Sequence, residues 1–285
     1  MSLLFTKMQA CGNDFIIVDD REGRFRSVQS DLARRLCQRR LGIGADGLLL
    51  VLEGSAPGRF GMSFVNADGL IGEMCGNGAR CLAAYLHRGG LVDQELVIET
   101  LVGPVNVDFS RLPSIELTLG PARIVRRGIE ITWGGSVLRF DEVDAGPPHA
   151  VCWVDSLEAL DRVDMVELGR MVRNHPAFAP RGCNVNLATL TPDGGVHIRT
   201  YERGVEDETL GCGTGAVSVA AVLLDQAPGV STRRVVTRSG EALFVDLGSP
   251  EAPSLRGGAQ FVAQGTIDPS LWADLLRPSP ALAAA

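Results

Sequence analysis

Two stretches of the chain are apolar at almost every position. Ala79–Leu86 reads ARCLAAYL, and Ala216–Leu224 reads AVSVAAVLL. An amphipathic surface helix would alternate apolar and polar faces, whereas a helix that is apolar nearly all round is buried on every side. The pattern therefore predicts two helices that are each enclosed by other elements.

Short apolar runs divided by glycine, proline and asparagine turns predict strands for much of the remaining chain. In the first part these are Leu3–Met8, Phe15–Val18, Leu48–Leu52, Met62–Asn66, the hairpin of Glu95–Thr100 with Val105–Phe109, and Ile115–Leu119. In the second part they are Ile129–Trp133, Val137–Val143, Ala150–Val154, Val185–Leu190, Val196–Tyr201, the hairpin Arg234–Val245, and Gln260–Thr266. Helical spacing predicts two further helices, Asp31–Arg40 with Ser30 or Asp31 as its cap and another around Asp164–Arg173.

A glycine-rich motif opens both apolar helices. Cys75-Gly76-Asn77-Gly78-Ala79 is matched 137 positions later by Cys212-Gly213-Thr214-Gly215-Ala216. The same offset pairs Ala83 with Ala220, Leu86 with Leu223, Thr100 with Thr237 and Gly103 with Gly240. A register that holds over about thirty residues indicates that the chain consists of two duplicated halves.

The motif puts each cysteine at or just before the N-terminus of a helix. There the unpaired backbone N–H groups and the positive end of the helix dipole lower the pKa of a thiol and can hold an anion. If a pseudo-two-fold axis relates the halves, Cys75 and Cys212 can flank one cleft. Two thiols would then lie on either side of whatever occupies that cleft.

The length of 285 residues is enough for two domains, each with its own core. We expect an N-terminal half at 1–121, completed by a segment at about 264–277, a C-terminal half at 122–263, and a disordered tail at 278–285.

The net charge of −7 argues against nucleic acid and against an anionic membrane as partners, because both require a basic face. No stretch has the length of a membrane span or the apolar core of a signal peptide, so we expect a cytoplasmic protein whose seven cysteines stay reduced. The histidines and cysteines lack the spacing of a metal site, and no metal is expected. Lys7 is the only lysine and has no phosphate-binding context, which leaves no suitable Schiff base for pyridoxal phosphate.

The motifs of this chain resemble those of the diaminopimelate epimerases, in order and spacing over nearly the whole sequence. The resemblance rests on Gly12-Asn13-Asp14-Phe15, Gly42-Ile43-Gly44-Ala45-Asp46-Gly47, Asn66-Ala67-Asp68-Gly69, Met74–Cys81, Pro148-His149, Asn184-Val185-Asn186, Tyr201-Glu202-Arg203-Gly204 and Glu208–Gly215. It implies an α+β fold of two pseudo-symmetric domains, each with mixed β-sheets wrapped around a central buried helix. It also implies a homodimer and a small amino-acid substrate, with no cofactor.

The resemblance also implies roles for individual residues. Cys75 and Cys212 would be the thiolate and thiol that remove and deliver the α-proton on opposite faces, with His149 and Glu202 assisting them. Backbone N–H groups of Gly76, Asn77, Gly213 and Thr214 would hold the α-carboxylate as charge grows on it. Further substrate contacts would come from Asn13, Asn66, Asn184, Glu202 for the distal ammonium, and Arg203 for the distal carboxylate.

Two departures bear on the substrate. Many members of the family read Asn-Pro-His where this chain has Pro147-Pro148-His149, and the family varies between glutamine and glycine at the position of Gly47. Epimerisation of LL-diaminopimelate to the meso form remains the leading hypothesis, and a cofactor-independent racemase of another amino acid, such as histidine, is the alternative. A phenazine-type isomerase would use a carboxylate in place of the two thiols. A thiol–disulfide switch in a binding protein would usually carry Cys-x-x-Cys, which this chain lacks.

Overall fold

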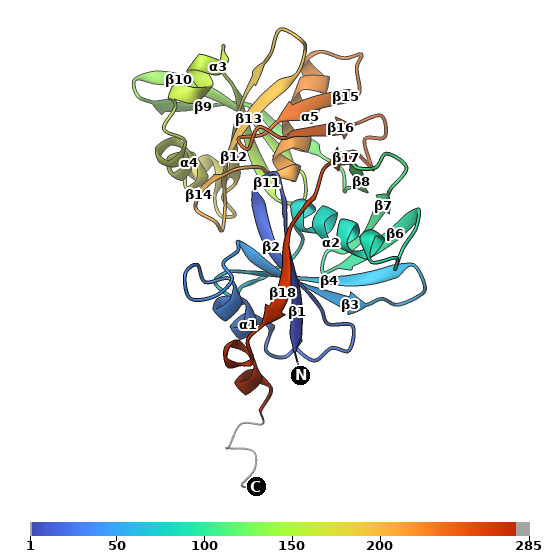
Figure 1. Ribbon diagram of the computed structural model, residues 1–285. Coiled ribbons are helices and arrows are strands. Elements are labelled where there is room, and N and C mark those ends of the chain that lie inside the picture. The colour runs from blue at the N-terminus through green and yellow to red at the C-terminus, as the bar shows by residue number, and fades with distance from the viewer. Residues whose placement is uncertain (1, 278–285) are drawn as a thin grey trace. The chain divides into compact units, whose positions relative to one another are not determined.

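The computed structural model describes residues 2–277, and these form two compact units (Figure 1). Unit 1 contains the residues up to Ile115 together with those from Ala259 onward, and unit 2 contains Glu116–Gly258. The expected tail at 278–285 lies outside the described residues. No helix within residues 2–277 is both long and apolar enough to cross a membrane.

Unit 1 is a mixed sheet that packs on the helix α2 (Gly76–Arg88), with a short helix α1 (Gln29–Leu36) elsewhere in the unit. The strands pair in the order β18–β1–β2–β3–β4–β6–β7, and β5 pairs with the end of β4. Their bounds are β1 (Leu3–Ala10), β2 (Asn13–Asp19), β3 (Gly47–Glu53), β4 (Arg59–Asn66), β5 (Ile71–Gly72), β6 (Glu95–Thr100), β7 (Gly103–Asp108) and β18 (Gln260–Ile267).

Unit 2 packs a second mixed sheet on the helix α5 (Gly213–Gln226). Two short helices, α3 (Leu157–Arg162) and α4 (Met165–Arg173), follow one another in the chain segment that connects the strands β11 and β12. The strands pair in the order β9–β10–β11–β12–β13–β15–β16–β17–β8, and β14 pairs with the end of β13. Their bounds are β8 (Ile115–Thr118), β9 (Arg123–Trp133), β10 (Ser136–Asp144), β11 (Pro148–Trp153), β12 (Asn184–Leu190), β13 (Val196–Glu202), β14 (Asp207–Thr209), β15 (Thr232–Val236), β16 (Ala242–Asp246) and β17 (Ser254–Gly257).

The two units repeat one topology. From β18 to β7 and from β9 to β16, the pairings follow the same sequence: antiparallel, antiparallel, parallel, antiparallel, parallel, antiparallel. The helices α2 and α5 begin at Gly76 and Gly213, which are 213 − 76 = 137 positions apart, as the duplicated motif predicts. The expected α+β class with a buried helix in each half is therefore confirmed.

The expected halves, 1–121 and 122–263, differ from these units by a few residues at each boundary. After Ile115, strand β8 pairs with β17 of unit 2, and Leu119 N–H donates to Pro253 O. From Gln260 onward, β18 runs beside β1 at the opposite end of the sequence (Figure 1). Both boundaries between the units are thus set by the pairing of strands that are distant in sequence. Such pairing cannot be predicted from the local pattern of apolar residues.

The helix expected at Asp31–Arg40 is shorter than predicted at its C-terminal end. It ends at Leu36, and its N-cap is Val28, which makes no side-chain cap bond, so Ser30 and Asp31 lie inside the first turn. The chain then turns back over the helix end, where Gly44 N–H donates to Leu36 O. A Cβ at Gly42 would lie 2.3 Å from Arg35 O, so this return requires glycine.

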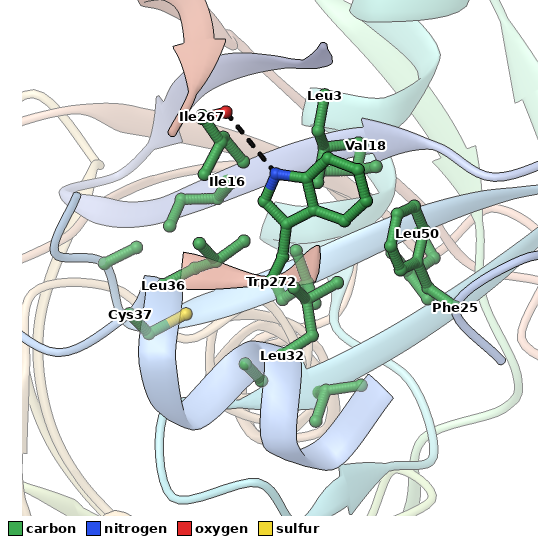
Figure 2. Packing of buried hydrophobic residues seen from close by; sticks show 14 residues of the cluster. Leu3, Ile16, Val18, Phe25, Leu32, Leu36, Cys37, Leu50, Ile267 and Trp272 are labelled. Atoms are coloured by element: carbon green, nitrogen blue, oxygen red, sulfur yellow. Dashed lines mark hydrogen bonds between the residues drawn. The ribbon is translucent and has the colours of Figure 1, made fainter. Parts of the chain in front are cut away.

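The core of unit 1 is completed by the C-terminal segment. After β18, two 3-10 helices, Pro269–Leu271 and Ala273–Leu276, bring Trp272 among residues of β2, β3 and α1 (Figure 2). Trp272 is 4% exposed, its ring meets Phe25 edge-on at 5.8 Å, and its Nε1–H donates to Ile267 O at 3.4 Å.

We predict that Trp272→Ala lowers the free energy of unfolding by about 3–5 kcal/mol, because it removes a large buried ring from a packed core. Urea denaturation followed by circular dichroism measures the change. Leu276→Ala in the same segment is the control, since Leu276 is 37% exposed and its loss should cost under about 1 kcal/mol. Equal effects of the two substitutions would show that the segment does not anchor unit 1 through its tryptophan.

Candidate active site

The structure places Cys75 and Cys212 at equivalent positions, as the N-cap residues of α2 and α5. Both have extended backbones, with φ −138° and ψ 115° at Cys75 and φ −118° and ψ 117° at Cys212. The first two helical residues are Gly76 and Asn77 in one unit and Gly213 and Thr214 in the other. The positive end of each helix dipole therefore lies beside a thiol.

Glycine at the third helical position lets each helix end pack closely. A Cβ at Gly215 would lie 2.5 Å from Asn186 Oδ1 and 3.3 Å from the Cβ of Cys212. At the equivalent Gly78, the nearest atoms would be Leu49 Cδ2 at 3.2 Å and the Cβ of Cys75 at 3.5 Å. The glycine at the third helical position is therefore more closely surrounded in unit 2 than in unit 1.

Around Cys75, an amide is held against the thiol. Asn13 on β2 donates through Nδ2 to Asp46 Oδ2 at 2.9 Å, and its Oδ1 lies 3.6 Å from Cys75 Sγ. Asp46 also accepts from Asp14 N–H at 3.1 Å and from Arg39 at 3.1 Å. The Cys75 sulfur in turn accepts from Gly78 N–H at 3.5 Å.

Arg80 lies in the first turns of α2 and is fully buried, at 0% exposure. Its Nη2 donates to Asn77 Oδ1 at 2.8 Å and to Cys11 Sγ at 3.5 Å. The amide of Asn77 is thereby oriented so that its Nδ2 faces Asn13 Oδ1 at 3.5 Å. Arg80 is not among the site residues predicted from the sequence, although a lone arginine inside an apolar helix is a signal that could have identified it.

Asn66 lies at the end of β4, directly across from Gly47 of β3. Its side chain donates to Leu70 O at 3.0 Å, so it closes the turn that leads to β5. A Cβ at Gly47 would lie 2.7 Å from the Phe64 ring and 3.0 Å from Val65 O. The packing of Phe64 explains why this chain carries glycine rather than a polar side chain at position 47.

Around Cys212, a buried histidine is the centre of the network. His149 on β11 has Nε2 3.0 Å from Thr214 Oγ1 and Nδ1 3.0 Å from Asn186 Nδ2. Thr214 Oγ1 lies 3.5 Å from Cys212 Sγ, which makes the threonine hydroxyl a bridge between the imidazole and the thiol. Asn186 and the hydroxyl of Thr214 were not predicted, because only tertiary structure brings them to His149.

Burial lowers the pKa of His149 to about 3, and the positive charge of Arg203 acts in the same direction. The imidazole is therefore neutral near pH 7. A neutral imidazole has one N–H and one acceptor nitrogen, so it orients a hydroxyl rather than supplying a charge.

The remaining predicted residues of unit 2 adjoin this histidine. Asn184 Nδ2 lies 3.3 Å from His149 Nε2, and its Oδ1 accepts from Arg203 N–H at 2.8 Å. The Arg203 side chain is exposed and its Nη1 donates to Arg181 O at 3.2 Å. Glu202 ends β13 and accepts from Thr209 Oγ1 at 2.5 Å. Each unit therefore brings its own share of the predicted residues together.

Four further cysteines, Cys37, Cys81, Cys152 and Cys183, are buried core residues. Cys37, Cys152 and Cys183 are buried, and burial raises the pKa of Cys37 and Cys183 to about 12 and that of Cys152 to about 11. Cys81 is buried inside α2. Thiols with such raised pKa values are not bases at neutral pH.

The single lysine has a structural partner. Lys7 Nζ lies 2.8 Å from Asp14 Oδ2, and it also donates to Gly44 O. Over residues 2–277, no three His, Cys, Asp or Glu side chains are grouped so that they could hold a metal ion.

Solved structures with this fold include several isomerases. A hydroxyproline epimerase from Agrobacterium vitis superposes with a TM-score of 0.71 at 17% identity, covering 93% of this chain and 91% of that one. A phenazine biosynthesis protein from Bacillus anthracis superposes with a TM-score of 0.75 at 15% identity, covering 94% and 99%. At such identities the likeness shows the fold alone.

Sequence comparison is more specific. The family model "Diaminopimelate epimerase" matches residues 5–125 and 142–259. The diaminopimelate epimerase of Chlorobaculum tepidum is 39% identical over 266 residues, which are 91% of this chain and 99% of that protein. The one from Hydrogenobaculum is 37% identical over 258 residues, or 86% and 91%. The protein is thus an isomerase of the epimerase and racemase class. Within that class, the chain belongs to the diaminopimelate epimerase family.

We predict that Gly215→Ala destabilises the protein by about 1–3 kcal/mol and that Gly78→Ala costs distinctly less. The added methyl at 215 meets Asn186 Oδ1, which cannot retreat because it accepts from Thr200 Oγ1 at 3.0 Å, whereas at 78 it meets a leucine methyl. Urea denaturation of the two variants in parallel measures the difference. A larger loss for Gly78→Ala would contradict the closer packing in unit 2.

Acid should weaken the fold through His149. Its pKa is about 3 in the folded protein and 6.5 without burial, so its contribution to stability is complete above pH 6.5 and is lost as the pH falls toward 3. His149→Gln should reduce the pH dependence of the free energy of unfolding in this window by up to about 1.4 kcal/mol per pH unit. Urea midpoints between pH 7 and pH 4 measure it, with His197→Gln as the control. An unchanged slope in His149→Gln would refute the prediction.

Proposed function

We propose that this enzyme interconverts LL-diaminopimelate and meso-diaminopimelate, with Cys75 and Cys212 as the acid–base pair. One observation carries the proposal: the two cysteines are the N-caps of equivalent buried helices in a chain of the diaminopimelate epimerase family. Inversion of a stereocentre requires a base on one face and an acid on the other. Two thiols can exchange these roles at each turnover.

The helix ends supply what the carbanion requires. When a thiolate removes the α-proton, negative charge spreads into the substrate's α-carboxylate. The N–H groups of Gly76, Asn77, Gly213 and Thr214 lie at the positively polarised starts of α2 and α5, where they can donate to that charge. This binding strengthens as the charge develops, so it lowers the barrier rather than only binding the substrate.

The distal end of the substrate is assigned to residues of unit 2. Arg203 offers a planar guanidinium that suits a carboxylate, and Glu202 offers a carboxylate for the distal ammonium. Asn184 supports both assignments, because its Oδ1 fixes the backbone of Arg203. Asn13 and Asn66 would contribute amide contacts from unit 1.

A biosynthetic role and a dimeric state follow from the same proposal. The family implies a place in lysine and peptidoglycan precursor synthesis, a reaction of small molecules in the cytoplasm. We also propose that the enzyme acts as a homodimer. Size-exclusion chromatography with light scattering tests the dimer independently of activity.

Proton NMR in D₂O tests the function directly. Incubation of reduced enzyme with LL-diaminopimelate should replace the α-proton signal with deuterium and produce the meso isomer. Cys75→Ala and Cys212→Ala should each lower turnover by about 10²- to 10⁴-fold, because each removes one proton-transfer group. Cys152→Ala is the matched control, since Cys152 is a core residue, and it should retain activity.

Other outcomes of the same experiment are informative. A persistent α-proton signal with diaminopimelate, together with exchange of histidine or another amino acid, would favour the racemase alternative. It would also indicate that Pro147, in place of the family's asparagine, changes which substrate is accepted. Exchange that survives in both cysteine variants would overturn the assignment of the acid–base pair.

A further inference from the structure

Position 147 is a proline, and it leaves the end of unit 2 that carries Arg203 short of a hydrogen-bond donor. Proline has neither a polar side chain nor a backbone N–H. Many members of the family carry asparagine at this position, whose amide would contact the distal end of the substrate. Any group that replaces this contact must come from another segment that reaches the same end of the sheet.

The strand pairing shows which segments reach that end. Strands β11 and β12 are parallel, with His149 opposite Asn184, so the residues that precede the two strands lie side by side. Strand β13 runs antiparallel to β12 and ends at Glu202, next to the start of β12. The segments 145–147 and 181–183 therefore meet at the end of the sheet where β13 finishes.

Arg181 contacts both of the other segments at this end. Its side-chain Nη2 donates to the backbone O of Gly146, the residue before Pro147, at 3.4 Å, and its Nη1 lies 3.9 Å from Asp144 Oδ2. Its own backbone O accepts from Arg203 Nη1 at 3.2 Å. One residue thus touches the segment that lacks a donor and the guanidinium that we assign to the distal carboxylate.

The guanidinium of Arg181 retains donors for a ligand. Both of its contacts are long, and its side chain is 60% exposed. Arg199 shows the opposite case, since its Nε and Nη2 each lie 2.7 Å from a carboxylate oxygen of Glu208 and its Nη1 donates to Leu160 O at 2.8 Å. An arginine has five N–H donors in a planar fork, and a fork that is not engaged in this way suits a carboxylate.

Charged side chains of both signs lie near this end of the sheet. The carboxylate of Glu206 is engaged with Arg173, at 2.9 Å, and Asp144 accepts from Gly146 N–H at 3.1 Å. Within residues 2–277, Arg203 forms no ion pair with a carboxylate, and Arg181 forms only the long one with Asp144. Two adjoining residues therefore offer positive charge that the protein itself does not closely neutralise.

We propose that Arg181 is a specificity-determining residue that binds the distal carboxylate of the substrate together with Arg203 and replaces the amide missing at Pro147. The inference rests on the proposed function, which places a second carboxylate at this end of unit 2. Two guanidinium groups favour an amino acid with a distal carboxylate over histidine, which has none.

Steady-state kinetics of Arg181→Met tests the proposal. Methionine retains much of the apolar stem and removes the charge. The KM for LL-diaminopimelate should rise about ten-fold, while kcat should stay within about two-fold, because a contact made equally in the ground state and the transition state changes KM alone. Arg139→Met is the matched control, since Arg139 is 75% exposed and pairs with Glu130 at 3.1 Å, and it should change neither constant.

The double variant Arg181→Met/Pro147→Asn separates binding from a structural role. It supplies an amide at the position of the proline, so most of the increase in KM should be reversed. If Arg181 merely held the turn at Gly146, an amide at position 147 would not restore the KM. Urea midpoints of the variants should match that of the native enzyme, because an exposed ion pair contributes little to stability.

Two outcomes would overturn the inference and leave the proposed function intact. One is an unchanged KM in Arg181→Met, and the other is an increase in KM that Pro147→Asn does not reverse. An enzyme that exchanges no α-proton of diaminopimelate before any substitution is made would instead refute the proposed function, and with it the distal carboxylate assigned to Arg181.

Discussion

The first N–H groups of a helix carry the positive end of its dipole, and this constraint shapes both units. In α2 and α5 those groups lie next to the cysteine N-caps, at the end of the helix that carries positive partial charge. The surrounding strands remove competing water from most of each helix. In the proposed reaction, this end of each helix would stabilise the negative charge that develops on the carbanion.

The duplication preserved the scaffold and allowed the interior to diverge. The pairing order of the strands is the same in both units, yet the groups behind the two thiols differ. Unit 1 uses a buried guanidinium, Arg80, and apolar side chains at Phe15 and Leu49. Unit 2 uses the neutral His149 held by Asn186. Two sites of one origin can thus differ in the polar groups around them without any change in backbone topology.

Three glycines lie where a Cβ atom would collide with neighbouring atoms. Gly42 permits the chain to return over the end of α1, Gly47 makes room for Phe64, and Gly215 makes room for Asn186. The missing polar side chain at position 47 therefore has a local steric cause.

By itself, the sequence determined the two buried helices, their cysteine N-caps, the duplication and the family, because these depend on local composition and on a register that repeats along the chain. The ends of the units, the early end of α1, and the partners of the thiols required tertiary structure. Strand β18 pairs with β1 across almost the whole sequence, and Trp272 enters a core built from residues more than two hundred positions earlier. His149, Asn186, Thr200 and Thr214 come from four different elements. No local pattern reveals that they meet, because hydrogen bonds between distant segments depend on how strands pair and not on the spacing of residues along the chain.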